Sequence, residues 1–529
     1  MIRTASMVIA AASRCSSASA ADPPLPTAKQ LEWMELETIQ FMHFSIPTFW
    51  KPPDDFLRRP NPTYHNCIAS WIPDHGEQTE GYYPCLNPKI FQPNDLDVEQ
   101  WMKSAASLNM KEICLTAKHA GGFTMWPSEY TPYGVQSASN WRGGKGDVLR
   151  EFVDAAKRWG IKICYYINPM TDGYLANVAN VSAAEFQRRQ KGMMTEVLTK
   201  YGPVNRLWFD GVNVGVVQKD MQTEAVYKPY YDSVFKMIRE ISPDTLISAY
   251  RGDVCTSIGS LYTNDGPAPN ASDSAECQPA SETGKYFHPT EMHGVTMQEG
   301  PDGNTPTTPT YWFWHPWACA GNVSGCPWVG HANASRIFNS YVATVGHGGV
   351  MNMNIAPDAT GRLNASVVQV MEEAGKAIND TFHLNDAGSV EGVSGACTDG
   401  VVVVQATGEF DYISTMEDLT KGQRIGNYSI DFQRKGSKQW EILVPPVQPV
   451  NSSDEKLLKE RDRPDGHDPR DQYIGHKRID KPIVQTSGAG SVEVAKVRLN
   501  CHRLVSSVEP GGAVYVRRFS LHKRRVPWD

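Results

Sequence analysis

The feature of this sequence that most constrains its fold is an alternation of helical and strand-like patterns from residue 96 to about residue 250. In each repeat, apolar residues first recur every three or four positions, as on one face of a helix, and a short continuous apolar run follows. The expected helices cover 96–108, 147–159, 183–201 and 223–241. The apolar runs that follow are 112–117, 161–167, 204–209 and 245–249. Apolar strands that alternate with helices indicate a parallel sheet covered by helices.

The apolar runs begin about 40–50 residues apart, and no Gly-x-Gly-x-x-Gly motif follows the first of them. The spacing therefore favours a (β/α)8-like TIM barrel over a doubly wound sheet. A helix over 334–345 and a strand over 350–355 are expected to add the last barrel unit, and a helix over 365–378 closes it. Residues 251–330 are rich in Pro, Gly, Ser and Thr, which indicates long loops over the barrel mouth.

Beyond residue 386 the pattern changes to short strand-like segments divided by turn residues, which predicts a C-terminal β-sandwich. The predicted strands are 401–405, 428–433, 440–444 and 492–499. A chain of 529 residues is also longer than one hydrophobic core usually serves. We therefore divide the chain into a signal peptide over 1–21, a catalytic barrel over 22–385 and a sandwich over 386–529.

Composition narrows the range of partners. The formal net charge is −7, which does not suggest a nucleic-acid-binding protein. No apolar stretch approaches the ~20 residues that a membrane-spanning helix needs. The sequence contains neither Cys-x-x-Cys nor His-Glu-x-x-His, so we expect no metal site and no cofactor.

Three features predict a secreted or extracellular protein, with a lysosome-like or vacuole-like compartment as the alternative. The first 21 residues contain a basic residue, Arg3, then an apolar run over 7–12 and a small-residue triplet over 18–20. This order resembles a cleavable leader. Asn-x-Ser/Thr triplets occur along the whole chain. They lie at Asn180, Asn270, Asn322, Asn333, Asn364, Asn379, Asn427 and Asn451.

The eleven cysteines are the third feature, because ten remain once Cys15 leaves with the leader. Candidate bridges join Cys67 to Cys85, Cys255 to Cys277 and Cys319 to Cys326. Cys114 and Cys164 lie in apolar runs, and we expect them to be buried free thiols.

Polar side chains gather where the expected strands end, which is the face of a TIM barrel that carries the chemistry. They include His43, His119, Tyr166, Asn168 and Asp210. Trp126 and Trp208 flank them as aromatic walls, so the set suits a neutral polyol such as a sugar. A carboxylate that ends a buried strand is costly unless it has a partner or a task, which singles out Asp210. The alternatives are that Asp210 caps the next turn and that the two histidines belong to the core.

Several motifs in the same order resemble the α-L-fucosidases of glycoside hydrolase family 29. They lie at 24–49, 115–133, 198–211, 312–315, 410–428 and 474–479. The likeness is greater to the plant-type branch that acts on α-1,3/1,4-linked fucose than to the lysosomal branch. The resemblance implies an exo-acting enzyme that releases α-L-fucose from oligosaccharides or glycoconjugates by retaining double displacement.

The resemblance assigns the nucleophile to Asp210, and the fucose-binding groups to His43, His119, Tyr166 and Trp208. Further substrate-binding candidates within the aromatic motifs are Trp126, Trp312 and His315.

Two departures from the family pattern bear on activity. The usual Lys-His-His-Asp-Gly-Phe is Lys-His-Ala-Gly-Gly-Phe over 118–123 here, and the stretch 259–261 lacks the usual acid/base glutamate. We expect Glu291, in a Pro-Thr-Glu segment, to take that role, with Asp265 and Asp253 as alternatives. The other readings are an impaired relative that binds fucosylated glycans, and a hydrolase with shifted sugar specificity.

Overall fold

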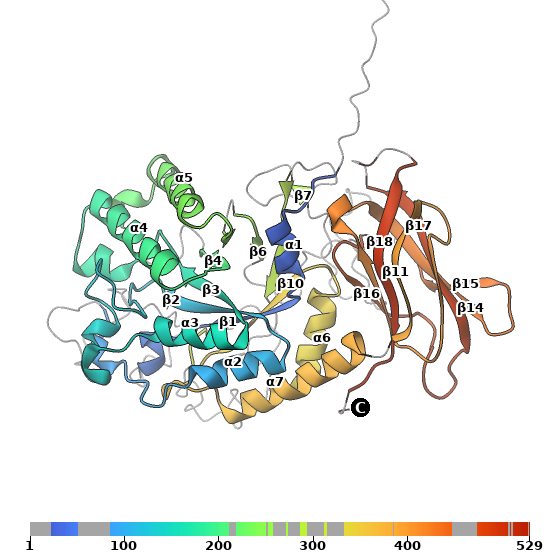
Figure 1. Ribbon diagram of the computed structural model, residues 1–529, viewed down its shortest axis with the longest axis horizontal. Coiled ribbons are helices and arrows are strands. Elements are labelled where there is room, and N and C mark those ends of the chain that lie inside the picture. Colours follow the sequence, from blue (N-terminus) through green and yellow to red (C-terminus); the bar gives the residue numbers. More distant parts are fainter. Residues whose placement is uncertain are drawn as a thin grey trace, which may run out of the picture.

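The computed structural model describes most of the chain (Figure 1). The described residues are 23–50, 85–210, 218–249, 252–257, 271–272, 286–293, 312–314, 333–384, 386–446, 473–505, 508, 511–526 and 528.

Eight parallel strands form the central sheet, in the order β5-β4-β3-β2-β1-β10-β9-β6. They are β1 (Thr38–Met42), β2 (Glu112–Lys118), β3 (Lys162–Ile167), β4 (Arg206–Trp208), β5 (Leu246–Ser248), β6 (Cys255–Ser257), β9 (Thr290–His293) and β10 (Val350–Asn354). The sheet is curled, and a parallel bridge links Ser248 at the end of β5 to Val254 just before β6.

Helices surround this curled sheet (Figure 1). They are α1 (Ala28–Met34), α2 (Val98–Ser107), α3 (Val148–Trp159), α4 (Ala183–Lys200), α5 (Glu224–Ile241), α6 (Ala334–Thr344) and α7 (Ala365–Ile378). Local chemistry explains their ends. The side chain of Asp147 accepts a hydrogen bond from the Arg150 N–H at the start of α3, and Gly160 ends the helix with a φ of 65°. None of the helices in the described segments is both long and apolar enough to cross a membrane.

The expected helices and strands between residues 96 and 378 are confirmed, with ends that differ by two residues or fewer. The stretch 251–330 differs from expectation because it contributes β6 and β9 to the sheet, not loops alone. A two-stranded sheet of β7 (Ala271–Ser272) and β8 (Tyr286–Phe287) also falls there.

Two four-stranded sheets follow, in the orders β11-β18-β13-β16 and β12-β17-β14-β15. Their pairings are antiparallel. The strands are β11 (Asp386–Ala396), β12 (Val402–Gln405), β13 (Tyr412–Glu417), β14 (Ile425–Arg434), β15 (Trp440–Val444), β16 (Arg478–Asp480), β17 (Val494–Leu504) and β18 (Ala513–His522). Both sheets contribute to one apolar cluster that includes Ile413, Phe432, Leu499 and Phe519.

The expectation that Cys114 and Cys164 are free thiols is wrong, because the structure joins them in a disulfide. The two residues are direct partners on β2 and β3, with Cα atoms 4.1 Å apart. A second disulfide joins Cys397 to Cys501 in the antiparallel part. Cys85 and Cys255 are also disulfide-bonded. Their expected partners, and the pair expected at 319 and 326, lie outside the described residues.

A buried ionic cluster connects the parallel and antiparallel parts. Lys477, just before β16, donates to Glu37 at 2.6 Å, and the Tyr341 hydroxyl of α6 donates to Glu37 at 2.6 Å. Burial alone would raise the pKa of Glu37, but the charges of Lys477 and His383 and these hydrogen bonds outweigh it and lower the pKa to about 2. The cluster therefore depends on Glu37 being ionised.

We predict that Lys477→Met lowers the free energy of unfolding at neutral pH by roughly 3 kcal/mol, because it breaks a buried ion pair. The pKa of Glu37 is lower in the folded state than in the unfolded state, so the pair stabilises the fold above pH 4.5. The difference between variant and wild type should therefore narrow as the pH falls from 4.5 towards 2. Chemical denaturation across this range measures it.

The matched control is Lys435→Met, which removes a lysine from an exposed ion pair with Glu493 and should leave stability close to wild type. Equal changes in the free energy of unfolding from the two substitutions would contradict the stabilising role of the Lys477–Glu37 pair.

Candidate active site

The carboxylate of Asp210 lies just beyond the carboxyl end of β4 and is partly exposed. The Tyr166 hydroxyl at the end of β3 donates to its Oδ2 at 3.0 Å. Asn168, two residues further along, donates from its side chain to the Asp210 carbonyl at 3.2 Å. Burial raises the pKa of Tyr166 well above 10, and the charge of Asp210 raises it further. Tyr166 therefore remains a hydrogen-bond donor that fixes one oxygen of the carboxylate.

Two histidines face this pair. His43 follows β1, and its Nδ1 lies 2.7 Å from Asn354 Oδ1 on β10. Because the Asn354 side-chain nitrogen donates to the Trp312 carbonyl at 2.9 Å, its oxygen is the acceptor and His43 Nδ1 is the donor. His119 follows β2 and stacks on the Tyr166 ring, with centroids 5.0 Å apart. The sequence-predicted residues at the ends of β1, β2, β3 and β4 thus come together.

Aromatic rings form the base and one wall of the site. The Trp208 ring stacks on Tyr166 at 5.2 Å, and Phe41 lies 4.9 Å from Trp208. The ring centroid of Trp312, a predicted substrate-binding residue, lies 5.1 Å from that of His43. The ring centroid of Phe313 lies 5.0 Å from that of His119.

Sequence reasoning did not single out Phe41 or Phe313 as site residues. The signals were present. Phe41 near the end of β1 precedes His43 by two positions, a spacing that puts side chains of an extended chain on one face, and Phe313 lies within the motif over 312–315.

Trp126 does not join this group of rings. Its side chain is buried, and the indole N–H donates to Glu196 of α4 at 2.9 Å, beside the Ser128 hydroxyl at 2.7 Å. These contacts fasten the connection after β2 to α4, which argues against substrate binding by Trp126. His315 lies outside the described residues.

The contacts of Glu291 argue against the acid/base role expected for it. The residue lies on β9, and its side chain is fully buried. One carboxylate oxygen accepts from the Trp208 indole at 3.0 Å and from the Asn352 side chain at 2.8 Å, while the other pairs with Arg206. A general acid must reach the leaving oxygen of the substrate, and both oxygens of Glu291 are engaged inside the sheet.

Asp253 lies at the opposite end of the strands from Asp210. Its carboxylate accepts from the Ile247 N–H of β5 at 2.8 Å and pairs with Arg239 in the last turn of α5. Gln30 of α1, which lies before β1, donates to its carbonyl. These contacts argue against Asp253 as the acid. Asp265, the third candidate, lies outside the described residues.

Ala120 and Gly121, which replace the His-Asp pair usual in the family motif, lie where the connections after β2 and β3 meet. The carbonyls of these two residues accept from the N–H groups of Gly173 and Tyr174, at 2.9 and 3.1 Å. The side chain of Ala120 is fully buried. The altered motif is therefore packed between the two connections.

A buried ion pair holds the same two connections. Lys118 lies 3.5 Å from Asp172, with both side chains fully buried, and donates to the Thr171 carbonyl at 2.7 Å. Burial lowers the pKa of Lys118, while Asp172 acts in the opposite direction. Gly122 has a φ of +92°, and a Cβ there would lie 2.2 Å from an Asp172 oxygen, so the pair needs glycine at this position.

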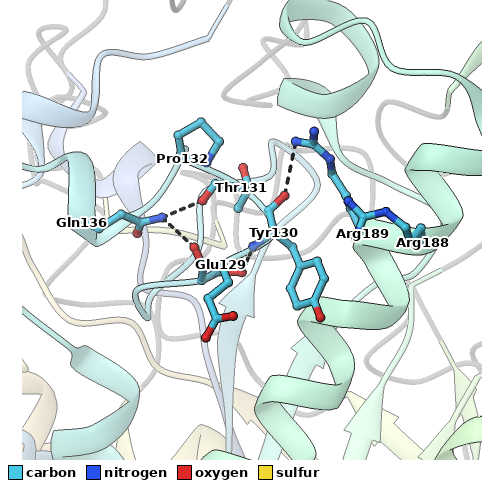
Figure 2. A pocket seen from close by; sticks show the side chains of 8 residues that line it. Glu129, Tyr130, Thr131, Pro132, Gln136, Arg188 and Arg189 are labelled. Atoms are coloured by element: carbon cyan, nitrogen blue, oxygen red, sulfur yellow. Dashed lines mark hydrogen bonds between the residues drawn. The ribbon is translucent and has the colours of Figure 1, made fainter.

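A second hollow lies between the connection after β2 and α4 (Figure 2). Its lining residues are Ser128, Glu129, Tyr130, Thr131, Pro132, Gln136, Arg188 and Arg189. Arg188 and Arg189 both pair with Glu185, and Gln136 donates to two carbonyls of the same connection. None of the strand-end residues lines this hollow, so it is separate from the site around Asp210.

The arrangement around Asp210 suits attack on a neutral sugar. A partly exposed carboxylate can act as a nucleophile, buried histidine and tyrosine groups can bind hydroxyls, and ring faces can pack on apolar sugar surface. Within the described parts of the chain, no cluster of three or more His, Cys, Asp or Glu residues is arranged to hold a metal ion.

Comparisons with known proteins agree with this geometry. The chain is 26% identical over 462 residues to alpha-L-fucosidase 1 of Arabidopsis thaliana, covering 80% of this chain and 79% of that protein. The structure resembles that of a putative alpha-L-fucosidase from Bacteroides thetaiotaomicron, with a TM-score of 0.67, 22% identity, and coverage of 95% of this chain and 100% of that one. It also resembles a Ruminococcus gnavus GH29 fucosidase in complex with fucose, with a TM-score of 0.66, 19% identity, and coverage of 96% and 97%.

The sequence profile of the alpha-L-fucosidase family matches residues 41–381, from within β1 to beyond α7, and includes Asp210. The chain therefore belongs to the α-L-fucosidase family of glycoside hydrolases, family 29.

Proposed function

We propose that this enzyme releases terminal α-L-fucose from oligosaccharides or glycoconjugates by a double displacement in which Asp210 is the nucleophile. The observation that carries the proposal is the partly exposed Asp210 carboxylate held by the Tyr166 hydroxyl at a strand end. Attack on the anomeric carbon forms a covalent fucosyl-enzyme, and water then hydrolyses it with overall retention. The fucose complex of the Ruminococcus gnavus relative supports fucose as the sugar.

Binding of the sugar is assigned to the groups around Asp210. Donation by His43 Nδ1 to Asn354 Oδ1 fixes the orientation of the imidazole ring beside the Asp210 and Tyr166 pair. His119 and Tyr166 are placed to contact further hydroxyls, while Trp208 and Trp312 present ring faces that suit the apolar methyl side of fucose.

We also propose a domain architecture and a cellular location for the protein. The curled parallel sheet with its helices is best described as a (β/α)8-like barrel within 22–385, and the two antiparallel sheets as a β-sandwich within 386–529. The bridge between Ser248 and Val254 supports closure of the barrel, and the apolar cluster shared by the two antiparallel sheets supports the sandwich. Residues 1–21 are proposed to act as a secretion signal.

We assign the general acid/base role to Asp265. Glu291 and Asp253 are held by contacts away from the Asp210 carboxylate, whereas Asp265 follows the carboxyl end of β6 in the sequence. Carboxyl ends of parallel barrel strands lie on the catalytic face, which supports this choice. Retaining enzymes hold the two carboxyl groups about 5–5.5 Å apart.

An impaired relative that binds fucosylated glycans is the second candidate function. The replacement of His and Asp by Ala120 and Gly121 favours it, because two polar groups of the usual motif are absent. The two candidates differ in turnover of a natural fucoside.

The nucleophile is tested by Asp210→Gly. We expect kcat on an aryl α-L-fucoside to fall by roughly 10³-fold or more, and added azide to restore turnover with the β-fucosyl azide as product. Product NMR identifies the anomer. Asp220→Gly, which removes an exposed aspartate, is the control and should keep wild-type kcat. Near-wild-type activity of Asp210→Gly would remove Asp210 from this role.

The acid is tested by comparing leaving groups in Asp265→Ala. General acid catalysis contributes typically 10²–10⁴-fold, and most when the leaving group is poor, such as a sugar. We therefore expect hydrolysis of a fucosylated oligosaccharide to fall by roughly 10²-fold or more, with turnover of an activated aryl fucoside nearly unchanged.

Equal loss on both substrates, or full activity on both, would show that Asp265 is not the acid. Wild-type enzyme that binds fucosylated oligosaccharides but hydrolyses neither substrate would favour the impaired relative.

A further inference from the structure

We propose that Glu291 is a positioning residue for the nucleophile, acting on Asp210 through the Trp208 indole and the Tyr166 hydroxyl. The inference rests on the proposed function of Asp210 and extends it to a buried carboxylate that does not touch the substrate.

The contacts form a continuous path between strands. Glu291 on β9 accepts from the Trp208 indole N–H at 3.0 Å. The Trp208 ring stacks on Tyr166, with centroids 5.2 Å apart and planes 21° apart. Tyr166 donates to Asp210 Oδ2 at 3.0 Å. Each link fixes the orientation of the next group, so the carboxylate of Glu291 sets where the tyrosine hydroxyl points.

The charges around Arg206 indicate that Glu291 does more than hold the sheet together. Arg206 on β4 is fully buried and pairs with two fully buried carboxylates, Glu112 on β2 and Glu291. Glu112 alone would neutralise the guanidinium, and Ser248 already accepts from it at 2.8 Å. A second buried carboxylate at the same guanidinium therefore adds a desolvation cost beyond what neutralising Arg206 needs. Glu112 bonds to Asn205 and Arg206, whereas Glu291 bonds to the aromatic base of the site.

The carboxylate form is specifically suited to this position. Donors converge on both oxygens of Glu291, with Arg206 at one oxygen and the Trp208 and Asn352 N–H groups at the other. A glutamine offers one oxygen and one NH2 group. Its oxygen would face the guanidinium, because that hydrogen bond is charge-assisted, and its NH2 group would oppose the indole N–H. The indole would then shift, and the Tyr166 ring stacked on it would follow.

The alignment of the Tyr166 hydroxyl should affect the ionisation of Asp210. A hydrogen bond to the ionised form of a carboxyl favours that form, so the Tyr166 hydroxyl helps to keep Asp210 charged. Loss of the alignment should move the acidic limb of the kcat/KM profile to higher pH, because that profile reports ionisation in the free enzyme. If Glu291 only stabilised the fold, its substitution would leave the acidic limb of the kcat/KM profile at the same pH.

The test compares Glu291→Gln with Glu112→Gln on an aryl α-L-fucoside across pH, in the full chain. Both variants remove one fully buried carboxylate from the same guanidinium, so they match in charge and burial. For Glu291→Gln we expect kcat/KM to fall by roughly 10- to 100-fold. The acidic limb should move up by ~0.5–1 pH unit. For Glu112→Gln we expect an unchanged limb.

A double substitution tests whether the effect passes through the tyrosine. Tyr166→Phe alone should shift the acidic limb upward, and Glu291→Gln should add no further shift in that background. If Glu291→Gln does not fold, Trp208→Phe is measured in its place. That variant keeps the ion pairs of Arg206 but removes the indole N–H, and the same upward shift is expected.

Several results would overturn the inference while leaving Asp210 as the nucleophile: an unchanged acidic limb in Glu291→Gln, equal shifts in both glutamine variants, or additive shifts in the double variant. Wild-type enzyme without activity, or full activity of Asp210→Gly, would instead remove the proposed function, and this inference with it.

Discussion

The guanidinium of Arg206 lies between two buried carboxylates inside the parallel sheet, and the rest of the site is built on that arrangement. An ion removed from water is tolerated only when its charge and its hydrogen bonds are matched. Glu112, Arg206 and Glu291 therefore hold β2, β4 and β9 in one relative register. Along β4, alternate residues share a face, so Trp208 and then Asp210 follow Arg206 towards the carboxyl end. The nucleophile thus lies one layer above Trp208, whose indole Glu291 holds.

The same principle organises the surroundings of the site. The connections after β2 and β3 are joined by Lys118 and Asp172, a second fully buried pair, and these connections carry His119 and Asn168. At the junction with the antiparallel sheets, Lys477 compensates Glu37. In each place, buried charges with matching partners join segments that are distant in sequence. The buried pairs thus hold the scaffold on which the residues around Asp210 are carried.

Much of this architecture follows from local pattern. Helical and strand periodicity, with ends such as Asp147 and Gly160, locates the main elements, and parallel strands bring His43, Tyr166 and Asp210 to one edge. The exceptions depend on register between strands. Cys114 and Cys164 form a disulfide because they are direct neighbours on β2 and β3, which neither run reveals alone. Glu291 falls on a short strand in a Pro-rich and Gly-rich stretch, where no periodicity marks it as interior.

The central claim is that Asp210 forms a covalent bond to fucose. It is tested most directly by incubating the enzyme with 2-deoxy-2-fluoro-α-L-fucosyl fluoride and mapping the adduct by peptide mass spectrometry. The fluorine at C2 destabilises the cationic transition state and slows hydrolysis of the intermediate, while fluoride departs readily. The account predicts a single added 2-fluorofucosyl group on the peptide that contains Asp210. An adduct on another carboxylate, or turnover of the reagent without any adduct, would contradict it.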